Sequence, residues 1–161
     1  SVIGGTYGKV QRQSEVVIGG GDSLGINQTS IVQLGATTTD STPTNLTIQS
    51  DGSSLIKVQS SSIFGFEIKM IALCSGGVGG TAGDYDFFEV DGAIRVDDGY
   101  NLTIAQTLTH IAKVGVTGTA EVKTSGLDPY ITIEVTGQDG ISIEWFASVH
   151  ITEKKLKTGG F

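Results

Sequence analysis

The feature that most constrains the fold is a strict alternation of apolar and polar side chains near the end of the chain. Apolar residues take every second position from Ile131 to Val135 and again from Ile141 to Ile151, on either side of the turn 137–140. Successive side chains of a β-strand point to opposite faces, so this period predicts two half-buried strands. An Asp-Gly turn between two such runs is a strong hairpin signal. The sequence therefore predicts an antiparallel hairpin with Trp145 on its buried face and Phe146 on the opposite face.

Further segments upstream show the same alternation. The clearest are residues 63–73 and 87–96, and shorter ones occur at 45–49, 55–59, 102–104, 110–116 and 120–123. Together they predict about nine or ten strands and no amphipathic helix of useful length. Strands that are dry on one face pack as antiparallel sheets against each other. The predicted fold class is all-β, with an antiparallel, jelly-roll-like β-sandwich.

A second pattern, an internal repeat, marks the beginning of the chain. The tetrapeptide VIGG occurs at Val2–Gly5 and again fifteen residues later at Val17–Gly20, and Val32 and Gly35 return after another fifteen. This period is too short for helical repeats and is typical of a β-roll or β-solenoid coil. Glycine supplies 24 of the 161 residues, which suits a turn at each corner of a coil. Residues 1–40 are therefore predicted to be a repetitive, solenoid-like shaft segment.

Such a short stack of coils cannot bury its own apolar side and needs neighbours. We therefore expect a homotrimer in which three chains share one core. Phe146, a large aromatic residue on the solvent-facing side of the closing hairpin, would also need to be buried by a neighbouring subunit. The candidate trimer interface consists of Val16, Val17, Ile18, Ile31, Val32 and Phe146.

A turn-rich bridge, residues 36–44, separates the repeats from the alternating segments. We expect residues 41–161 to form the β-sandwich as a knob that keeps its fold without the repeat segment.

Charge and composition exclude several classes of partner. The formal net charge is −7, and the Lys and Arg residues form no basic stripe, which argues against a nucleic-acid partner. No apolar run reaches the roughly 18 residues that a membrane-spanning helix needs, so we expect no membrane insertion. The chain begins at Ser1 rather than Met, and we expect it to be a piece of a longer protein. The single cysteine, Cys74, is predicted to be a buried, inert thiol.

Catalytic patterns are scarce. His110 opens an apolar segment and is interpreted as a partly buried, satisfied histidine, and the glycine run 76–83 lacks the Lys-Ser/Thr ending of a phosphate-binding loop. Carboxylates that could hold an ion follow this run, but without the spacing of a calcium loop. They include Asp84, Asp86, Asp97 and Asp98. We expect no cofactor, no metal and no enzymatic activity.

A binding function is expected instead at exposed loop tips that combine aromatic residues with flexible glycines. The loop 75–85 between two predicted strands is the leading candidate, with two tyrosines elsewhere behind it. The candidate receptor-binding residues are Gly76, Gly77, Thr81, Asp84, Tyr85, Tyr100 and Tyr130.

The closing hairpin, with the sequence EVTGQDGISIEWFASV at residues 134–149, resembles the end of the C-terminal domains of tail fibres and tailspikes of tailed bacteriophages. Glu144 and Phe146 occupy positions that vary in that group. The resemblance extends loosely from Leu46 to Lys154, while the fifteen-residue repeats are similar to the β-roll heads of trimeric autotransporter adhesins.

The resemblance implies the distal module of a homotrimeric tail fibre on a virion, which binds a host cell-surface receptor, either a glycan or an outer-membrane protein. It transfers no catalytic residue. Alternatives are a structural spacer or decoration protein of a virion, a fragment of a polysaccharide-degrading enzyme, and an adhesin head on a bacterial cell surface.

Overall fold

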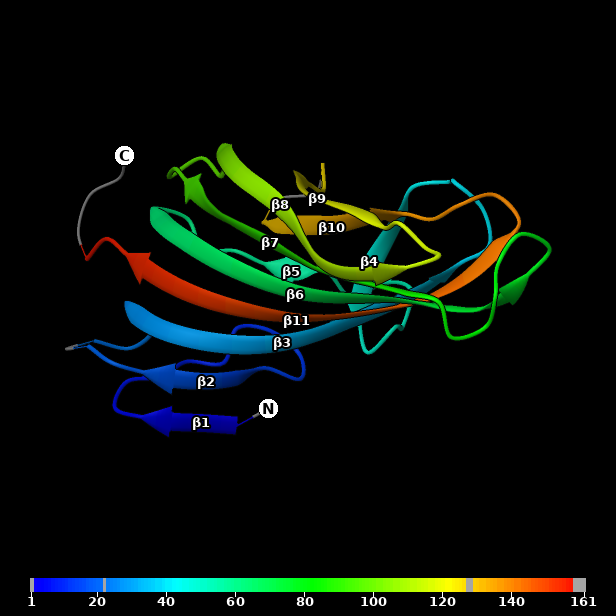
Figure 1. Cartoon of the computed structure of the whole chain (residues 1–161). Helices are drawn as coiled ribbons and strands as arrows, with labels where there is room; N and C mark the ends of the chain where they lie inside the picture. Colours follow the sequence, from blue (N-terminus) through cyan, green and yellow to red (C-terminus); the bar gives the residue numbers. More distant parts are fainter. Residues whose placement is uncertain (1, 22, 127–128, 158–161) are drawn as a thin grey trace.

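The computed structural model describes residues 2–21, 23–126 and 129–157, and within these ranges the chain forms eleven β-strands and no helix (Figure 1). The prediction of an all-β fold is therefore confirmed. The strands are β1 (Val2–Gly5), β2 (Val16–Gly19), β3 (Asn27–Thr38), β4 (Thr44–Ile48), β5 (Ile56–Lys57), β6 (Ser62–Gly77), β7 (Tyr85–Val96), β8 (Leu102–Val114), β9 (Thr119–Thr124), β10 (Tyr130–Thr136) and β11 (Ile141–Lys155).

The strands pair in the order β5-β10-β4-β3-β11-β6-β7-β8, with β9 beside β10 and with β1 and β2 extending from β3. All these pairs are antiparallel except β1 with β2. The predicted closing hairpin differs from the structure, because β10 and β11 follow each other in the chain but pair with different partners. β10 pairs with β4, β5 and β9, whereas β11 lies between β3 and β6. The predicted jelly-roll order is not established by this pairing.

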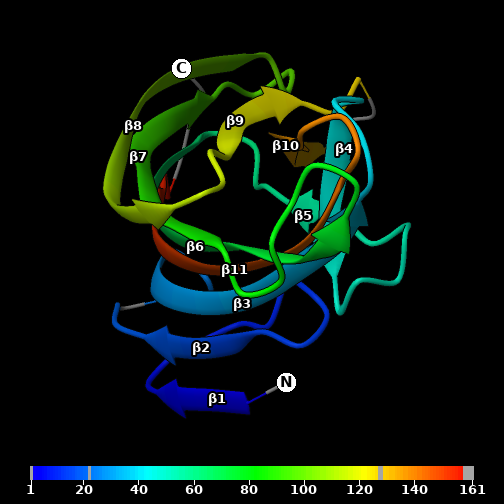
Figure 2. The ribbon, with the colours of Figure 1, turned by 45° about the vertical axis from the view of Figure 1, so that its right-hand side comes forward.

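The sheet curls so that two walls face each other around the core (Figure 2). One wall contains β3, β11, β6, β7 and β8, the other contains β5, β9 and β10, and β4 joins them by pairing with both β3 and β10. The described strands do not close into a barrel. Between β8 and β9 a side chain bridges the gap, since Gln106 Nε2 donates to the carbonyl of Val122 (3.1 Å) and Gln106 Oε1 accepts from its N–H (2.8 Å).

The core fills the space between the walls and follows the predicted alternation. On β11 every second residue from Ile141 to Ile151 is buried, and Trp145 packs edge-on against Phe88 of β7 with ring centroids 6.5 Å apart. The Trp145 Nε1–H donates to Thr38 Oγ1 at 2.9 Å, so the indole has the polar partner that a buried tryptophan requires. Cys74 is also buried, as predicted.

The strand β8 is longer than expected. The sequence predicted separate strands at 102–104 and 110–116, but β8 runs without a break from Leu102 to Val114. Its middle is built from Ala, Gln and Thr, which are poor markers of a buried face. Leu102, Ile104 and Leu108 do alternate and pack against the core, but Gln106 interrupts the apolar positions between them and no residue of the strand is fully buried.

The repeats at the beginning of the chain pair in two different ways. β1 and β2 pair in parallel, as successive coils of a solenoid would, although Val2 lies opposite Val16 and not opposite its repeat partner Val17. The third repeat departs from this pattern, because β2 pairs antiparallel with β3. A stack of identical coils needs parallel pairing at each step, so the third repeat is not a coil in this structure.

The strand β3 belongs to the main sheet, although the sequence prediction placed it in the shaft segment 1–40. It pairs with β11 from Asn27 to Thr38, and its Val32 and Leu34 lie in the hydrophobic core. This pairing argues against a knob that folds without residues 27–40.

The segment before β2 is fastened to the sheet by a buried ionic network at the end remote from Ile141. Arg12 Nη1 lies 2.5 Å from Glu15 Oε1, and Arg12 Nη2 lies 3.4 Å from Glu153 Oε2 on β11, with all three side chains fully buried. Arg12 Nε also donates to the carbonyl of Lys57 (2.7 Å), and its guanidinium lies 5.2 Å from the ring centroid of Phe64. One side chain thus ties residues near the start of the chain to β5, β6 and β11.

These contacts predict that deletion of residues 1–41 unfolds the protein, because it removes β3 from one side of β11 as well as Arg12. Deletion of residues 1–5 is the control, since β1 pairs only with β2. Far-ultraviolet circular dichroism and a thermal melt of both proteins measure the difference. A cooperative, near-native melt of the protein that lacks residues 1–41 would restore the predicted boundary at residue 40.

Substitution of Arg12 by Met should cost about 3–5 kcal/mol, because it leaves two buried carboxylates without their counter-charge. The matched control is Lys69→Met, which breaks the solvent-exposed pair of Lys69 with Glu89 (3.8 Å) and should cost less than about 1 kcal/mol. Urea unfolding of both variants gives the two free energies. Equal losses would show that the Arg12 network contributes no more than a surface pair.

Candidate functional site

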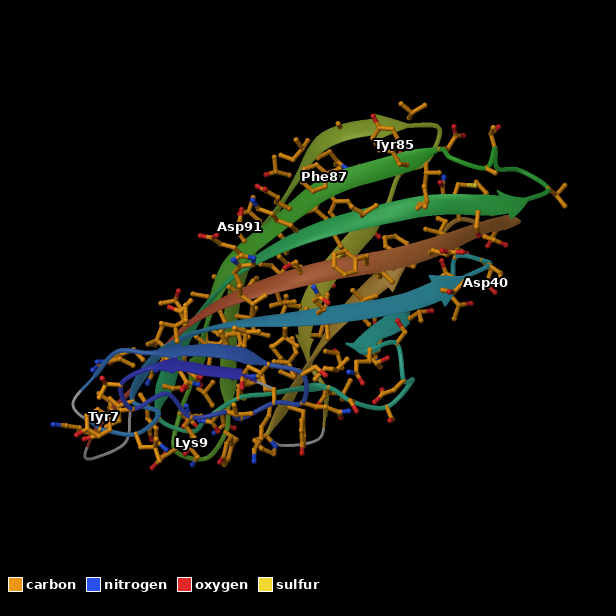
Figure 3. All side chains as sticks on the ribbon, turned by 90° about the horizontal axis from the view of Figure 1, so that it is seen from below. Tyr7, Lys9, Asp40, Tyr85, Phe87 and Asp91 are labelled. Atoms are coloured by element: carbon orange, nitrogen blue, oxygen red, sulfur yellow. The ribbon has the colours of Figure 1, made fainter. Side chains whose placement is uncertain are left out.

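Connecting segments gather at one end of the curled sheet, which we call the loop end. It comprises the β3–β4 loop (39–43), the β6–β7 loop (78–84), the β8–β9 loop (115–118) and the β10–β11 turn (137–140). Three of these segments project together at the right of Figure 1, away from β1 and β2. Figure 3 likewise shows Asp40 at the opposite extremity from Tyr7 and Lys9.

The β6–β7 loop has a rigid base and an exposed tip. At its base the Cys74 N–H donates to the carbonyl of Asp84 (2.8 Å) and the Gly83 N–H donates to the carbonyl of Cys74 (2.9 Å). The Gly79 N–H donates to the carbonyl of Gly140 and so docks the loop on the neighbouring turn (3.2 Å). Val78 at the tip is fully exposed. An apolar side chain held in water on a fixed base is typical of a binding loop.

Glycine is required in this loop for two physical reasons. Gly77 has a φ of 111°, a conformation that side chains with a Cβ rarely adopt. A Cβ on Gly80 would lie 2.6 Å from Cys74 Sγ and 2.8 Å from a methyl carbon of Ile141. The loop is therefore packed against β6 and β11, whereas the sequence had predicted a flexible tip.

Side chains connect the other segments of the loop end. The Ser41 N–H donates to Asp139 Oδ1 (2.8 Å), and the Thr117 N–H donates to Gln138 Oε1 (3.2 Å). Hydrogen bonds from the Ser41 side chain and then from its backbone N–H hold the pKa of Asp139 below its usual value of 3.8. The β10–β11 turn is thus hydrogen-bonded to each of the other three segments of the loop end.

A buried carboxylate, Asp86, supports the loop end from inside the sheet. Asp86 Oδ2 lies 2.9 Å from His110 Nδ1 and accepts from the Gly118 N–H at 2.8 Å. His110 packs against Phe88 with ring centroids 5.5 Å apart. This arrangement agrees with the interpretation of His110 as a satisfied, partly buried residue. Asp86 has the same strand parity as Phe88 and Val90, a signal in the sequence that could have placed it inside.

The four carboxylates considered as ion ligands do not come together. Asp84 and Asp86 lie at the loop end, whereas Asp97 and Asp98 lie beyond the other end of β7. Asp97 Oδ1 accepts from the Asn101 N–H (2.8 Å), and its pKa is lowered chiefly by the hydrogen bond from the Asn101 side chain. Among the described residues, no group of three or more His, Cys, Asp or Glu side chains could hold a metal ion.

The structure brings together five of the seven candidate receptor-binding residues. Gly76, Gly77, Thr81, Asp84 and Tyr85 lie in or beside the β6–β7 loop. Tyr100 lies beyond the far end of β7, about 35 Å along the strand from Tyr85. Tyr130 opens β10, about 20 Å along that strand from the β10–β11 turn. The two tyrosines are therefore not part of one site with the loop.

The candidate interface residues divide into two groups. Val17 and Val32 are fully buried within the chain, so they have no surface to offer to a neighbouring subunit while this fold is kept. Val16 and Ile18 are exposed on β2, and Val16 lies opposite the half-buried Ile31 of β3. Phe146 is exposed on β11, on the face opposite to Trp145, as predicted.

Phe146 has apolar neighbours that the sequence analysis did not single out. Ile71 and Leu73 of β6 are exposed on the outer face of the sheet, and Tyr85 and Phe87 follow on β7. Figure 3 shows Tyr85, Phe87 and Asp91 in succession along that strand. The signal was present in the sequence, because Ile71 and Leu73 share the strand parity of Glu67 and Lys69 and so replace the polar residues of that face with apolar ones.

The hydrogen bond between Ser41 and Asp139 predicts a titration at the loop end. A lowered pKa in the folded state means that this contact stabilises the fold above about pH 3.8 and is lost as the pH falls through the lower, folded value. The amide proton of Ser41, followed by nuclear magnetic resonance, should titrate with a midpoint below 3.8. In Asp139→Asn this titration should vanish. A midpoint at or above 3.8 in the unsubstituted protein would contradict the contact.

Within the described ranges, the structure has no helix with the length and hydropathy to cross a membrane. No family model matches the sequence, and no curated protein matches it. Among solved structures, the chain is similar to the tailspike protein of Acinetobacter baumannii phage AM24, with a TM-score of 0.38 and 10% sequence identity. The match covers 76% of this chain and 27% of the tailspike chain. A TM-score of this size does not establish a common fold.

Proposed function

We propose that this chain is a binding and assembly module of a homotrimeric fibre on a virion, of the kind found in the tail fibres of tailed bacteriophages, and that it is not an enzyme. In this proposal the loop end contacts a receptor on the host cell surface, and the remainder of the sheet holds the loops in place and associates with other copies. The resemblance of the closing strands to tail-fibre C-terminal domains supports the assignment of the chain to a phage tail fibre.

The observation that carries the binding role is the construction of the β6–β7 loop. Its base is fixed by backbone hydrogen bonds to Cys74 and Gly140, while the side chain of Val78 at the tip is fully exposed to solvent. Exposing an apolar side chain on a rigid base costs solubility and gives no stability to the fold. A bound partner would bury Val78 without having to order the loop first, which keeps the entropic cost of binding low.

The buried pair of Asp86 and His110 supports a structural role rather than a catalytic one. Asp86 already lies within hydrogen-bonding distance of two partners, His110 and the backbone N–H of Gly118 in the β8–β9 loop. The pair thereby joins β7, β8 and that loop beneath the loop end. Its proposed task is to position the loops.

A cell-binding experiment tests the proposal. The fluorescently labelled protein is incubated with a panel of intact bacterial strains, and bound protein is measured by flow cytometry. Val78→Glu should weaken binding at least about tenfold, because it places a charge at the centre of the contact. Leu24→Glu is the matched control, since Leu24 is also an apolar, exposed loop residue but lies in the β2–β3 loop near the opposite end.

Three results would contradict the proposal in different ways. Equal binding by Val78→Glu and the unsubstituted protein would remove the receptor contact from the loop end. Loss of binding in Leu24→Glu alone would move it to the opposite end. An unsubstituted protein that binds no strain of the panel would favour the alternative of a structural spacer.

A further inference from the structure

The outer face of β11, β6 and β7 carries a continuous apolar band next to the loop end. Strand register places Phe146 opposite Ile71 and Ile71 opposite Phe87. In the adjacent row, Leu73 lies opposite Tyr85. Side chains directly opposite on one face are in contact distance, so these five residues form one patch across three strands.

The band is large for a solvent-exposed surface. Its clearly exposed members, Phe146, Ile71, Leu73 and Tyr85, have exposed fractions between 37% and 44%. A large side chain covers about 200 Å², so these four residues offer about 300 Å² of mostly apolar surface. The largest patch on a typical monomer covers about 300–600 Å² and is often functional. A contiguous patch of this size across three strands therefore suggests a contact surface.

The remainder of the same face shows what an ordinary wet face of this sheet looks like. Directly beyond the band, Lys69 lies opposite Glu89, and in the next row Glu67 lies opposite Asp91. Polar residues are the expected occupants of a solvated sheet face. Apart from Ile63 at the far end of β6, the exposed large apolar residues of β6, β7 and β11 lie in the part of these strands nearest the loop end.

We propose that this band faces the threefold axis of a homotrimer, where the bands of three copies of this chain pack against one another. The inference rests on the homotrimer of the proposed function and assigns it an interface. A standard interface buries about 800 Å² per partner, of which about 60% is apolar, or about 500 Å². The exposed area of the band supplies more than half of that apolar share.

The charge distribution favours this face over the acidic remainder of the surface for contact between copies. Each chain carries a formal net charge of −7, so copies repel each other, and the repulsion is smallest where the contact surfaces carry few carboxylates. The two rows of the band hold one charged side chain, Glu144, which lies at the margin opposite Leu73. The acidic pair of Glu67 and Asp91 begins two rows further along the strands. The band is thus a surface on which two copies of this acidic chain meet without opposing charges of the same sign.

Two isoleucines on one strand provide a matched test. Ile71 and Ile63 both lie on the outer face of β6, with exposed fractions of 42% and 40%. Ile71 is at the centre of the band, whereas Ile63 lies opposite Arg95 and Lys154 at the far end. Light scattering should give the unsubstituted protein and Ile63→Ser a mass near 50 kDa, three times 16.7 kDa. Ile71→Ser should dissociate to 16.7 kDa at micromolar concentration, while its circular dichroism spectrum stays unchanged.

Phe146→Ser is a second variant in the same row, and it decides the result if Ile71→Ser loses its fold. A trimer that persists in both band variants would overturn this interface and leave the homotrimer standing. Dissociation of Ile63→Ser to the same extent as Ile71→Ser would also overturn it. A monomeric unsubstituted protein would refute the homotrimer itself, while the binding of cells by the loop end is tested separately.

Discussion

The structure depends on the pairing of β11 with neighbours on both of its sides. β3 and β6 fix the register of this strand along almost its whole length. With the register fixed, the two-residue period of the side chains sends Trp145 into the core and Phe146 out of it, and a slip by one residue would exchange them. The same pairing also fixes the positions of the loops, because β3, β6 and β11 each adjoin one of the segments that meet at the loop end. One sequence pattern thus sets the core, the outer face and the position of the candidate site.

Much of the fold could be predicted from the sequence, since a strand that is buried on one face has an apolar residue at every second position. The inward direction of Trp145, the exposure of Phe146 and the all-β class all follow from that pattern. The partners of each strand could not be predicted, because alternation states which face is dry and not which strand lies alongside. For this reason β10 and β11 were expected to pair with each other, although they lie in different walls. The Gln106 bridge between β8 and β9 could not be predicted either. It consists of one amide side chain that hydrogen-bonds to the backbone of Val122, and a single side chain leaves no periodic pattern in the sequence.

The predicted boundary at residue 40 gives no sign that β3 pairs within the main sheet, for a related reason. Composition changes after Gly35, and a change in composition is an ordinary sign of a boundary. However, β3 uses its first half to pair with β2 and its second half to pair with β4, so one strand belongs to the repeats and to the main sheet at once. The Arg12 network reinforces this continuity at a considerable cost of desolvation, because one guanidinium is buried with two carboxylates. Removal of Arg12 would leave those carboxylates without compensation, so the N-terminal segment is bound to the sheet by more than its short strands.

The positions of the apolar band and the loop end connect the two proposals. Leu73 and Tyr85, at the edge of the band, adjoin the residues where the β6–β7 loop leaves and rejoins the sheet. Copies whose bands meet around a threefold axis that runs along the strands have their loop ends at the same end of the assembly. Three receptor contacts on one rigid tip would raise the effective affinity well above that of a single loop, with no further contact in any one of them. The opposite end, where β1, β2 and the Arg12 network lie, stays clear of this contact. The exposed apolar band adds no stability to a single chain. In an assembly, its burial between copies would hold the loop ends together.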